Sequence, residues 1–371
     1  MNFTRSGKFS RTSTTTNTTT NETLSTYGYY GSSVIYTASG GDTTLTGSAA
    51  NEAFIYDLTL SGTNALRFSG FDTFDAGGGD DIMDFTVRPA NAGHEYGTDA
   101  TVYGGLGNDV IWTAGSHLAN VYGDNGDIAG TSGSPVIGGN DRIDASAASA
   151  TSFIYGDANK VSNYVGGNDT IVGSAYTDQL SGDVMVAGNG FVGGNDVIFA
   201  GGGGWDALDG DAIYIGDGSD TVTAVCGNDT LHGSSDSDSL VGDASAIQSA
   251  GQVQFGNDII DGAGGDDYLF GDTADLGNKG TTVIGGNDTF VFQPNSGADT
   301  IFDFGQSAGS TYGDDLIDVS AYGYTSFASL NISGNGTDSV VVNFGGGNQV
   351  TVQNLTNTPL TLSASDFIFA S

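Results

Sequence analysis

The sequence has little cysteine, proline or basic character. Its 371 residues include one cysteine, four prolines and eight lysines and arginines. A single cysteine, Cys226, excludes an intramolecular disulfide, so stability has to come from another source. The formal net charge is −36, which argues against nucleic acid or an anionic membrane as a direct partner, because both would repel the chain. A compact chain of this charge repels itself, so we expect cations to hold it folded.

Long hydrophobic runs are also lacking. No run of about 18 apolar residues is present, so we expect no membrane-spanning helix. The first 20 residues, MNFTRSGKFSRTSTTTNTTT, contain no apolar core of a secretory signal. We therefore expect either a cytosolic protein or export without a cleaved N-terminal signal. Hydrophobic residues make up 37% of the chain, but they recur too regularly for a disordered protein.

Glycine and aspartate are abundant, and they form a repeat. Residues 201–209, GGGGWDALD, match the nonapeptide G-G-x-G-x-D-x-U-x at every specified position. The glycines permit a tight turn with positive φ. Asp206 then places a carboxylate beside the turn carbonyls, and Leu208 points into a core. Carboxylate and carbonyl oxygens are the ligands that calcium takes. Residues 104–112, GGLGNDVIW, form a second full match.

The nonapeptides belong to a longer unit. A Gly-Asn-Asp turn recurs with its asparagine at 108, 140, 168, 195, 228, 257 and 287, and a Gly-Asp pair follows each of the first six. The distance from this asparagine to the paired aspartate is nearly constant, whereas the distance to the next asparagine varies. We interpret the constant half as two nonapeptides that make one coil of a parallel β-roll. This places Ile171 and Leu180 inside and aligns Asp169 and Asp178 with their equivalents one coil away. We expect the variable half to form strands or hairpins carried off the roll.

These patterns predict an all-β protein, and no segment has a helical period. The expected fold is a parallel β-roll or β-helix of calcium-binding nonapeptide coils, with strand or hairpin insertions and a C-terminal β cap. We divide the chain into a Thr-rich arm (1–26), an N-terminal β region (27–100), the calcium-binding roll (101–288) and the cap (289–371). Composition favours an irregular arm, and the β-propensity of threonine favours an ordered one.

Residues 75–371 resemble the RTX (hemolysin-type) calcium-binding family, because of the full nonapeptides and the tandem doublets. The stretch from residues 285–292, GGNDTFVF, to residues 366–369, DFIF, is similar to the cap and export region of that family. The resemblance implies type I secretion led by an uncleaved C-terminus, folding in extracellular calcium, and a place outside the cell or on its surface. It also implies several bound Ca²⁺ ions, with ligands at Asp81, Asp109, Asp169, Asp178, Asp196, Asp206, Asp229, Asp238, Asp258, Asp267 and Asp288. The aspartates of the Gly-Asp pairs are weaker candidates: Asp183, Asp211, Asp243 and Asp272.

Catalytic motifs are lacking. His94, His117 and His232 are widely separated without an H-E-x-x-H motif, and no G-x-S-x-G motif is present. Paired aspartates such as Asp80-Asp81 lie in glycine turns, where metal ligation explains them better than the carboxylate pair of a glycosidase. Cys226 directly precedes a calcium turn, so we interpret it as a small apolar filler. We therefore expect no enzyme.

The sequence thus predicts a secreted, calcium-dependent structural protein that assembles with copies of itself into an S-layer, sheath or filament. The basis is that repeats and cap fill nearly the whole chain. One alternative is a monomeric secreted adhesin or signalling module, for which a cell-surface glycan is the partner considered. Another is an enzyme or toxin whose site lies in residues 27–100.

Overall fold

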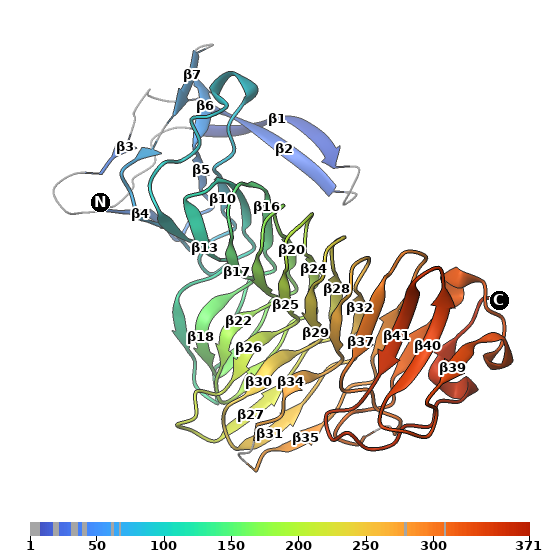
Figure 1. Ribbon diagram of the computed structural model, residues 1–371. Helices are drawn as coiled ribbons and strands as arrows, with labels where there is room; N and C mark the ends of the chain where they lie inside the picture. Colours follow the sequence, from blue (N-terminus) through green and yellow to red (C-terminus); the bar gives the residue numbers. More distant parts are fainter. Residues whose placement is uncertain are drawn as a thin grey trace.

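The chain forms a parallel β-solenoid of about nine turns. The structure is a computed structural model that describes residues 8–17, 22–30, 36–38, 43–60, 63–66, 68–277, 280–307 and 309–371. Figure 1 shows strands that follow one another in colour order from the N-terminal to the C-terminal end of the stack. The predicted all-β parallel β-helix is therefore confirmed.

Two long sheets form the first lobe of the solenoid. Sheet 1 contains, in spatial order, β5 (Ala53–Ile55), β10 (Ile82–Asp84), β12 (Val110–Gly115), β16 (Arg142–Ala148), β20 (Thr170–Val172), β24 (Val197–Phe199), β28 (Thr230–His232), β32 (Ile259–Asp261), β36 (Thr289–Val291), β38 (Leu316–Asp318) and β42 (Phe367–Ile368). Sheet 2 contains β4 (Thr44–Ser48), β9 (Thr73–Gly77), β11 (Ala100–Tyr103), β13 (Leu118–Tyr122), β17 (Phe153–Tyr155), β21 (Gln179–Ser181), β25 (Ala207–Asp209), β29 (Ser239–Val241), β33 (Tyr268–Phe270), β37 (Ala298–Ile301), β41 (Asn348–Val352), β40 (Val340–Gly345) and β39 (Asn331–Ser333). Within these two sheets the strands pair in parallel except in the cap, where β39, β40 and β41 pair antiparallel.

Two shorter sheets form a second lobe. Sheet 3 contains β14 (Asp127–Ala129), β18 (Ala158–Ser162), β22 (Val184–Ala187), β26 (Ala212–Ile215), β30 (Ala244–Ile247) and β34 (Thr273–Asp275). Sheet 4 contains β15 (Val136–Ile137), β19 (Tyr164–Val165), β23 (Phe191–Val192), β27 (Val222–Val225), β31 (Gly251–Gln254) and β35 (Thr282–Ile284). In Figure 1 the strands of sheet 3 lie below those of sheet 2, in the same order along the chain.

Each coil in this part of the chain therefore has four strands. One coil runs through β20, β21, β22 and β23 before the next Gly-Gly-Asn-Asp turn returns the chain to sheet 1 at β24. This corrects the expectation that two nonapeptides make a whole coil and that the variable half leaves the roll. The variable half forms strands, as expected, but they pair in parallel with their equivalents rather than as hairpins. The turn between sheets 3 and 4 absorbs the variation, since it spans residues 188–190 in one coil and 216–221 in the next.

Each lobe has its own apolar core. Ile171 and Leu180 are fully buried in the first lobe, as predicted, and they pair in register with Ile198 and Leu208 of the next coil. The second core is formed by residues of the variable half, such as Val184, Ala187 and Phe191. Burial of these apolar side chains in a core of their own thus explains why the variable half stays within the coil.

Strand pairing is continuous across residue 100, because β11 pairs with β9 of the preceding region. The Thr-rich arm, for which composition favoured an irregular conformation, contains β1 (Lys8–Asn17), paired antiparallel with β2 (Glu22–Tyr30). Lys279, in a variable half, lies outside the described residues. The remaining elements are β3 (Tyr36–Thr37) with β8 (Phe68–Ser69), β6 (Asp57–Leu60) with β7 (Thr63–Leu66), and the 3-10 turns η1 (Pro89–Asn91), η2 (Ser320–Tyr322), η3 (Phe327–Ser329) and η4 (Ala364–Asp366).

The stacked core gives a direct prediction for stability. Ile198 is fully buried in sheet 1, whereas Ile259 of the same sheet is 46% exposed. We expect Ile198→Ala to lower the free energy of unfolding by about 2–5 kcal/mol, because it removes buried contacts and leaves a cavity. Ile259→Ala is the matched control, with an expected change within about 0.5 kcal/mol. Urea unfolding in calcium measures both, and equal losses would contradict the assigned faces.

Candidate metal centre

One file of aspartates runs along the turn that enters sheet 1. We call it the first aspartate file; its members are Asp81, Asp109, Asp141, Asp169, Asp196, Asp229, Asp258, Asp288 and Asp315. Oδ1 of each aspartate accepts a hydrogen bond from the backbone N–H of its equivalent in the preceding coil. The N···O distance is 2.6 Å from Asp141 to Asp169 and from Asp169 to Asp196. The predicted alignment of Asp169 with its equivalents is therefore confirmed.

The second oxygen of these carboxylates is buried and has no hydrogen-bond partner. This holds for Oδ2 of Asp109, Asp141, Asp169, Asp196, Asp229, Asp258 and Asp288. A buried polar atom without a partner is uncommon in folded proteins, and a buried ionised carboxylate is costly unless a cation compensates it. Its repetition in successive coils therefore points to a repeated cation site.

Backbone carbonyls converge on the same oxygens. A Cβ atom on Gly156 would lie 1.6 Å from the carbonyl oxygen of Gly182 and 2.1 Å from Oδ2 of Asp169. A Cβ atom on Gly182 would lie 2.1 Å from Oδ2 of Asp196. Only glycine fits at these positions, and it leaves carbonyl and carboxylate oxygens side by side. This all-oxygen donor set suits a hard cation such as calcium.

The Gly-Asp pairs supply a second aspartate file, on the turn between sheets 2 and 3: Asp124, Asp157, Asp183, Asp211, Asp243 and Asp272. These carboxylates reach across the coil to the turn that enters sheet 1. Asp183 accepts a hydrogen bond from the N–H of Gly194 at 2.9 Å, and Asp272 accepts one from Gly286 at 2.6 Å. The residues ranked as weaker candidates from the sequence thus lie opposite the first file.

The two files meet inside the solenoid. Ligand atoms of Asp157, Asp169 and Asp183 all lie within 4.8 Å of one another, and so do those of Asp124, Asp141 and Asp157. Sequence reasoning did not include Asp124, Asp141 and Asp157 among the candidate ligands. Asp141 ends a Gly-Gly-Asn-Asp turn, and Asp124 and Asp157 end Gly-Asp pairs, so the same motifs could have identified them.

A third aspartate file lies on the turn between sheets 1 and 2: Asp178, Asp206, Asp238, Asp267 and Asp299. The backbone N–H of Asp178 donates to Oδ1 of Asp206 at 2.7 Å, so the predicted alignment also holds here. The turns differ at the second oxygen. Ser174 donates its N–H and hydroxyl to Oδ2 of Asp178 at 2.6 and 2.7 Å, whereas Oδ2 of Asp206 is buried without a hydrogen-bond partner. In the turn of Asp178 a serine therefore satisfies the second carboxylate oxygen, whereas in the full nonapeptide turn of Asp206 a cation could do so.

Burial raises the pKa values of many of these carboxyl groups, and neighbouring carboxylates raise some of those pKa values further. Burial raises the pKa of Asp109 to about 8, with repulsion from Asp81 and Asp124 adding to the effect. Burial also raises the pKa of Asp196 well above its usual value, with further repulsion from Asp211. Between the pKa of about 3.8 in the unfolded chain and about 8 in the folded chain, Asp109 is therefore protonated in the metal-free folded chain and ionised in the unfolded chain.

Asparagines form a separate file on the outside of the first. The backbone N–H of Asn168 donates to Oδ1 of Asn140 at 2.7 Å, and that of Asn195 donates to Oδ1 of Asn168 at 2.7 Å. These neutral side chains are exposed and hold coils in register without a cation. The recurring asparagine is therefore explained by these hydrogen bonds between coils.

Histidines do not take part in the clusters described. Among the described residues, none of the three groups with metal-binding spacing contains a histidine. His117 contacts Asp99 at 2.8 Å, and His232 stacks on Phe199 with ring centroids 4.9 Å apart.

No helix in the part of the chain that the structure describes is both long and apolar enough to cross a membrane.

Comparisons with protein families and with curated proteins found no match. The function is therefore inferred from the geometry of the aspartate files.

The raised pKa values predict a pH dependence. An aspartate with a pKa near 8 in the folded chain and 3.8 in the unfolded chain takes up a proton on folding. Folding of the metal-free chain should therefore weaken as pH rises through this window. We expect protein freed of metal on a chelating resin to unfold at lower urea at about pH 8 than at about pH 5. Calcium should reverse the trend, and a metal-free chain that gains stability with pH would contradict the assignment.

The third file predicts two kinds of aspartate. We expect Asp206→Asn to reduce the stabilisation that calcium supplies, because its second oxygen is the one left for a cation. Asp178→Asn should instead cost about 1–3 kcal/mol equally with and without calcium, because it disrupts the hydrogen bonds from Ser174. Unfolding curves of both variants in calcium, and without metal at about pH 5, where the buried carboxyl groups keep their protons, separate the two cases, and an identical calcium dependence would refute the distinction.

Proposed function

We propose that this chain is a calcium-dependent structural protein that folds outside the cell and assembles with copies of itself. The observation that carries the proposal is the row of buried carboxylate oxygens without hydrogen-bond partners, repeated from coil to coil. Calcium would neutralise these oxygens and join successive coils through the first and second aspartate files. Extracellular modules bind calcium in the range of about 10⁻⁴–10⁻³ M, which fits the resemblance to RTX proteins.

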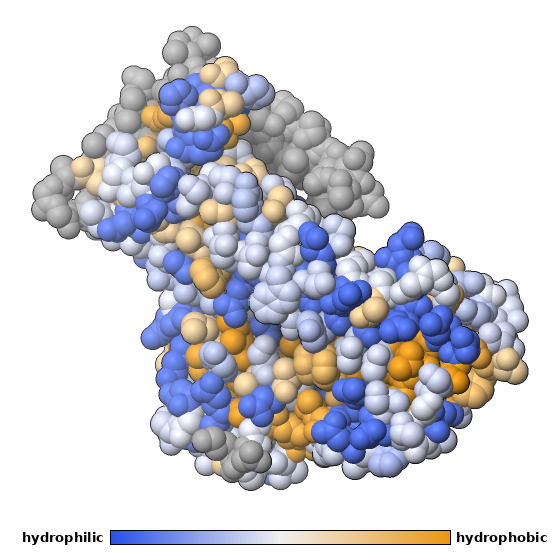
Figure 2. Space-filling model, in the orientation of Figure 1, coloured by the Kyte–Doolittle hydropathy of each residue, from blue (hydrophilic) through white to orange (hydrophobic). Residues whose placement is uncertain are grey.

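Assembly is supported by the outer surface of sheet 4. We call it the sheet-4 face; its outward column is Ile137, Val165, Val192, Val225, Gln254 and Ile284, which pair in register. Ile137 is 60% exposed and Ile284 45% exposed. No strand of sheet 4 contains a charged residue, in a chain of net charge −36. Apolar patches also lie among hydrophilic ones over the stacked coils in Figure 2.

Charge makes the sheet-4 face the natural contact between copies. Two surfaces rich in acidic groups repel each other, so copies of this chain approach most easily through a face without charge. Stacked β-branched side chains at strand spacing also present a regular apolar surface. The sheet-4 face therefore offers burial of apolar area without like-charge repulsion.

One observation favours the alternative of a monomeric binding module. A recess with a volume of about 340 Å³ lies beside the turns between sheets 3 and 4. It is lined by Lys160, Asp127, Asp217 and Asp220, and Lys160 pairs with Asp217 at 2.6 Å. Aliphatic residues such as Val161 and Val222 also line it, so its size and mixed lining suit a small ligand with polar groups and an apolar face, such as a single sugar.

The experiment that tests the proposal separates folding from assembly. We expect circular dichroism to show a large gain of β structure when calcium is added to chelated protein, because metal that binds only the folded state stabilises it. Light scattering and negative-stain electron microscopy should then show ordered sheets or filaments. The double variant Val192→Asp/Ile284→Asp should fold with calcium but remain monomeric, because it places charge on the sheet-4 face.

The matched control is Tyr176→Asp/Phe153→Asp, which adds the same two charges at exposed positions on the turn between sheets 1 and 2 and in β17 of sheet 2. This variant should assemble as the parent does. A chain equally folded in chelator would refute the calcium proposal. A calcium-folded parent that stays monomeric would refute assembly and favour the binding module.

A further inference from the structure

Cys226 occupies a position where most coils have glycine. The turn that enters sheet 1 begins with Gly138, Gly166, Gly193 and Gly285 in four coils, with Cys226 in a fifth and with Phe255 in the coil after it. The glycines leave no space for a side chain: a Cβ atom on Gly193 would lie 1.6 Å from Oδ1 of Asp211. The thiol of Cys226 is therefore built into the second aspartate file.

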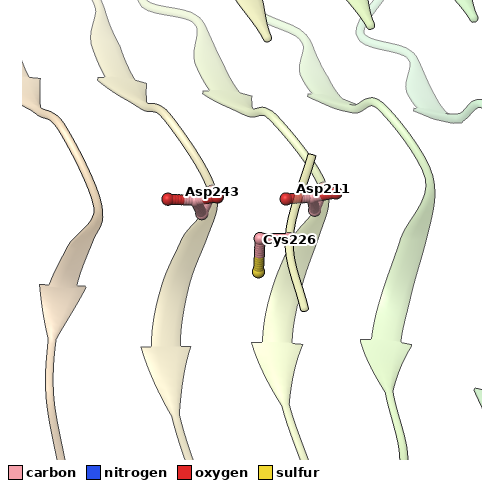
Figure 3. A group of neighbouring side chains, drawn as sticks. All are labelled: Asp211, Cys226 and Asp243. Atoms are coloured by element: carbon pink, nitrogen blue, oxygen red, sulfur yellow. The ribbon is translucent and has the colours of Figure 1, made fainter. Parts of the chain in front are cut away.

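The thiol lies between two carboxylates of that file. Figure 3 shows Cys226 between Asp211 and Asp243, which belong to successive coils. Ligand atoms of the three residues all lie within 4.8 Å of one another, and all three residues are buried. Oδ1 of Asp243 accepts a hydrogen bond from the N–H of Gly256 at 2.8 Å, but its Oδ2 is buried without a hydrogen-bond partner. This second oxygen is an independent sign that the group lacks a ligand.

We propose that Cys226, Asp211 and Asp243 form a site for a thiophilic divalent cation such as Zn²⁺ or Cd²⁺. Calcium takes oxygen ligands, whereas zinc binds thiolate sulfur together with carboxylate oxygen. The other two clusters of this kind, Asp124–Asp141–Asp157 and Asp157–Asp169–Asp183, offer oxygen alone. The thiol therefore changes the metal preference of one coil.

The bound ion would cross-link two successive coils. On binding, the thiol proton leaves to solvent, and the three side chains draw together around the ion. The ion then joins Asp211 of one coil to Asp243 of the next. In a chain with one cysteine, this cross-link is available through a metal although not through a disulfide. The inference goes beyond the proposed calcium role, because it concerns a different metal at a single coil.

The test uses the calcium-loaded full chain, so that the all-oxygen sites are already filled. We titrate it with Cd²⁺ and record the ultraviolet charge-transfer band of a cadmium–thiolate bond. We expect one equivalent of Cd²⁺ to produce the band, and Zn²⁺ to remove it by competition. Zn²⁺ should also raise the melting temperature of the calcium-loaded parent.

Three variants complete the experiment. Cys226→Gly restores the residue found in four other coils, so it should fold with calcium and show neither the band nor the zinc-induced shift in melting temperature. Cys226→Ser should behave likewise. Asp243→Asn should still form the band, but only at Cd²⁺ concentrations about tenfold or more higher, since it removes a ligand and even loss of a residue that supports a ligand commonly costs about 10–100-fold in metal affinity.

Two outcomes would overturn the proposal: no band in the parent, or an equal zinc-induced shift in Cys226→Gly. Calcium-dependent folding of Cys226→Gly reports separately on the proposed function, so failure of one proposal is distinguishable from failure of the other.

Discussion

The structure depends on one hydrogen bond that is repeated between coils. A carboxylate oxygen of each aspartate in the first file accepts a hydrogen bond from the backbone N–H of the equivalent residue in the preceding coil, as Asp196 does from Asp169. The bond satisfies a turn N–H that would otherwise be orphaned, and it fixes the register of the stack. It also holds the carboxylate in the interior. The second oxygen is then buried, and only a proton or a cation can compensate its charge.

Glycine and short acidic side chains follow from this arrangement. Carbonyl oxygens of successive coils and the second carboxylate oxygens crowd the Cα atoms of Gly156 and Gly182, so that no Cβ atom fits there. Aspartate places its carboxylate one bond from Cβ, close to the turn that it serves, and a glutamate would overshoot. This accounts for aspartate rather than glutamate in the three files, which hold 20 of the 41 aspartates of the chain. The composition is thus a consequence of tight coil-on-coil contact.

The sequence predicted the stacking but not the shape of a coil. Regular spacing of the turns was enough to place Ile171 and Leu180 inside and to align Asp169 and Asp178. The path of the variable half was not predictable, because a short apolar segment such as residues 184–187 indicates a strand without saying which strand it pairs with. The opposition of Asp183 and Gly194 was hidden for a related reason. A local motif does not show that a turn between sheets 2 and 3 faces the turn that enters sheet 1.

The three aspartate files place charge where an ordinary globular protein has little of it. Here the three aspartate files lie inside the coils, while neutral and apolar residues such as Asn168 and Val192 lie on outer surfaces. Without cations, the buried acids oppose folding, and the net charge of −36 opposes contact between copies. A cation bound in each coil would weaken both effects at once. Folding and assembly would then depend on the same ions, and a chain that meets calcium only outside the cell would not assemble before it arrives there.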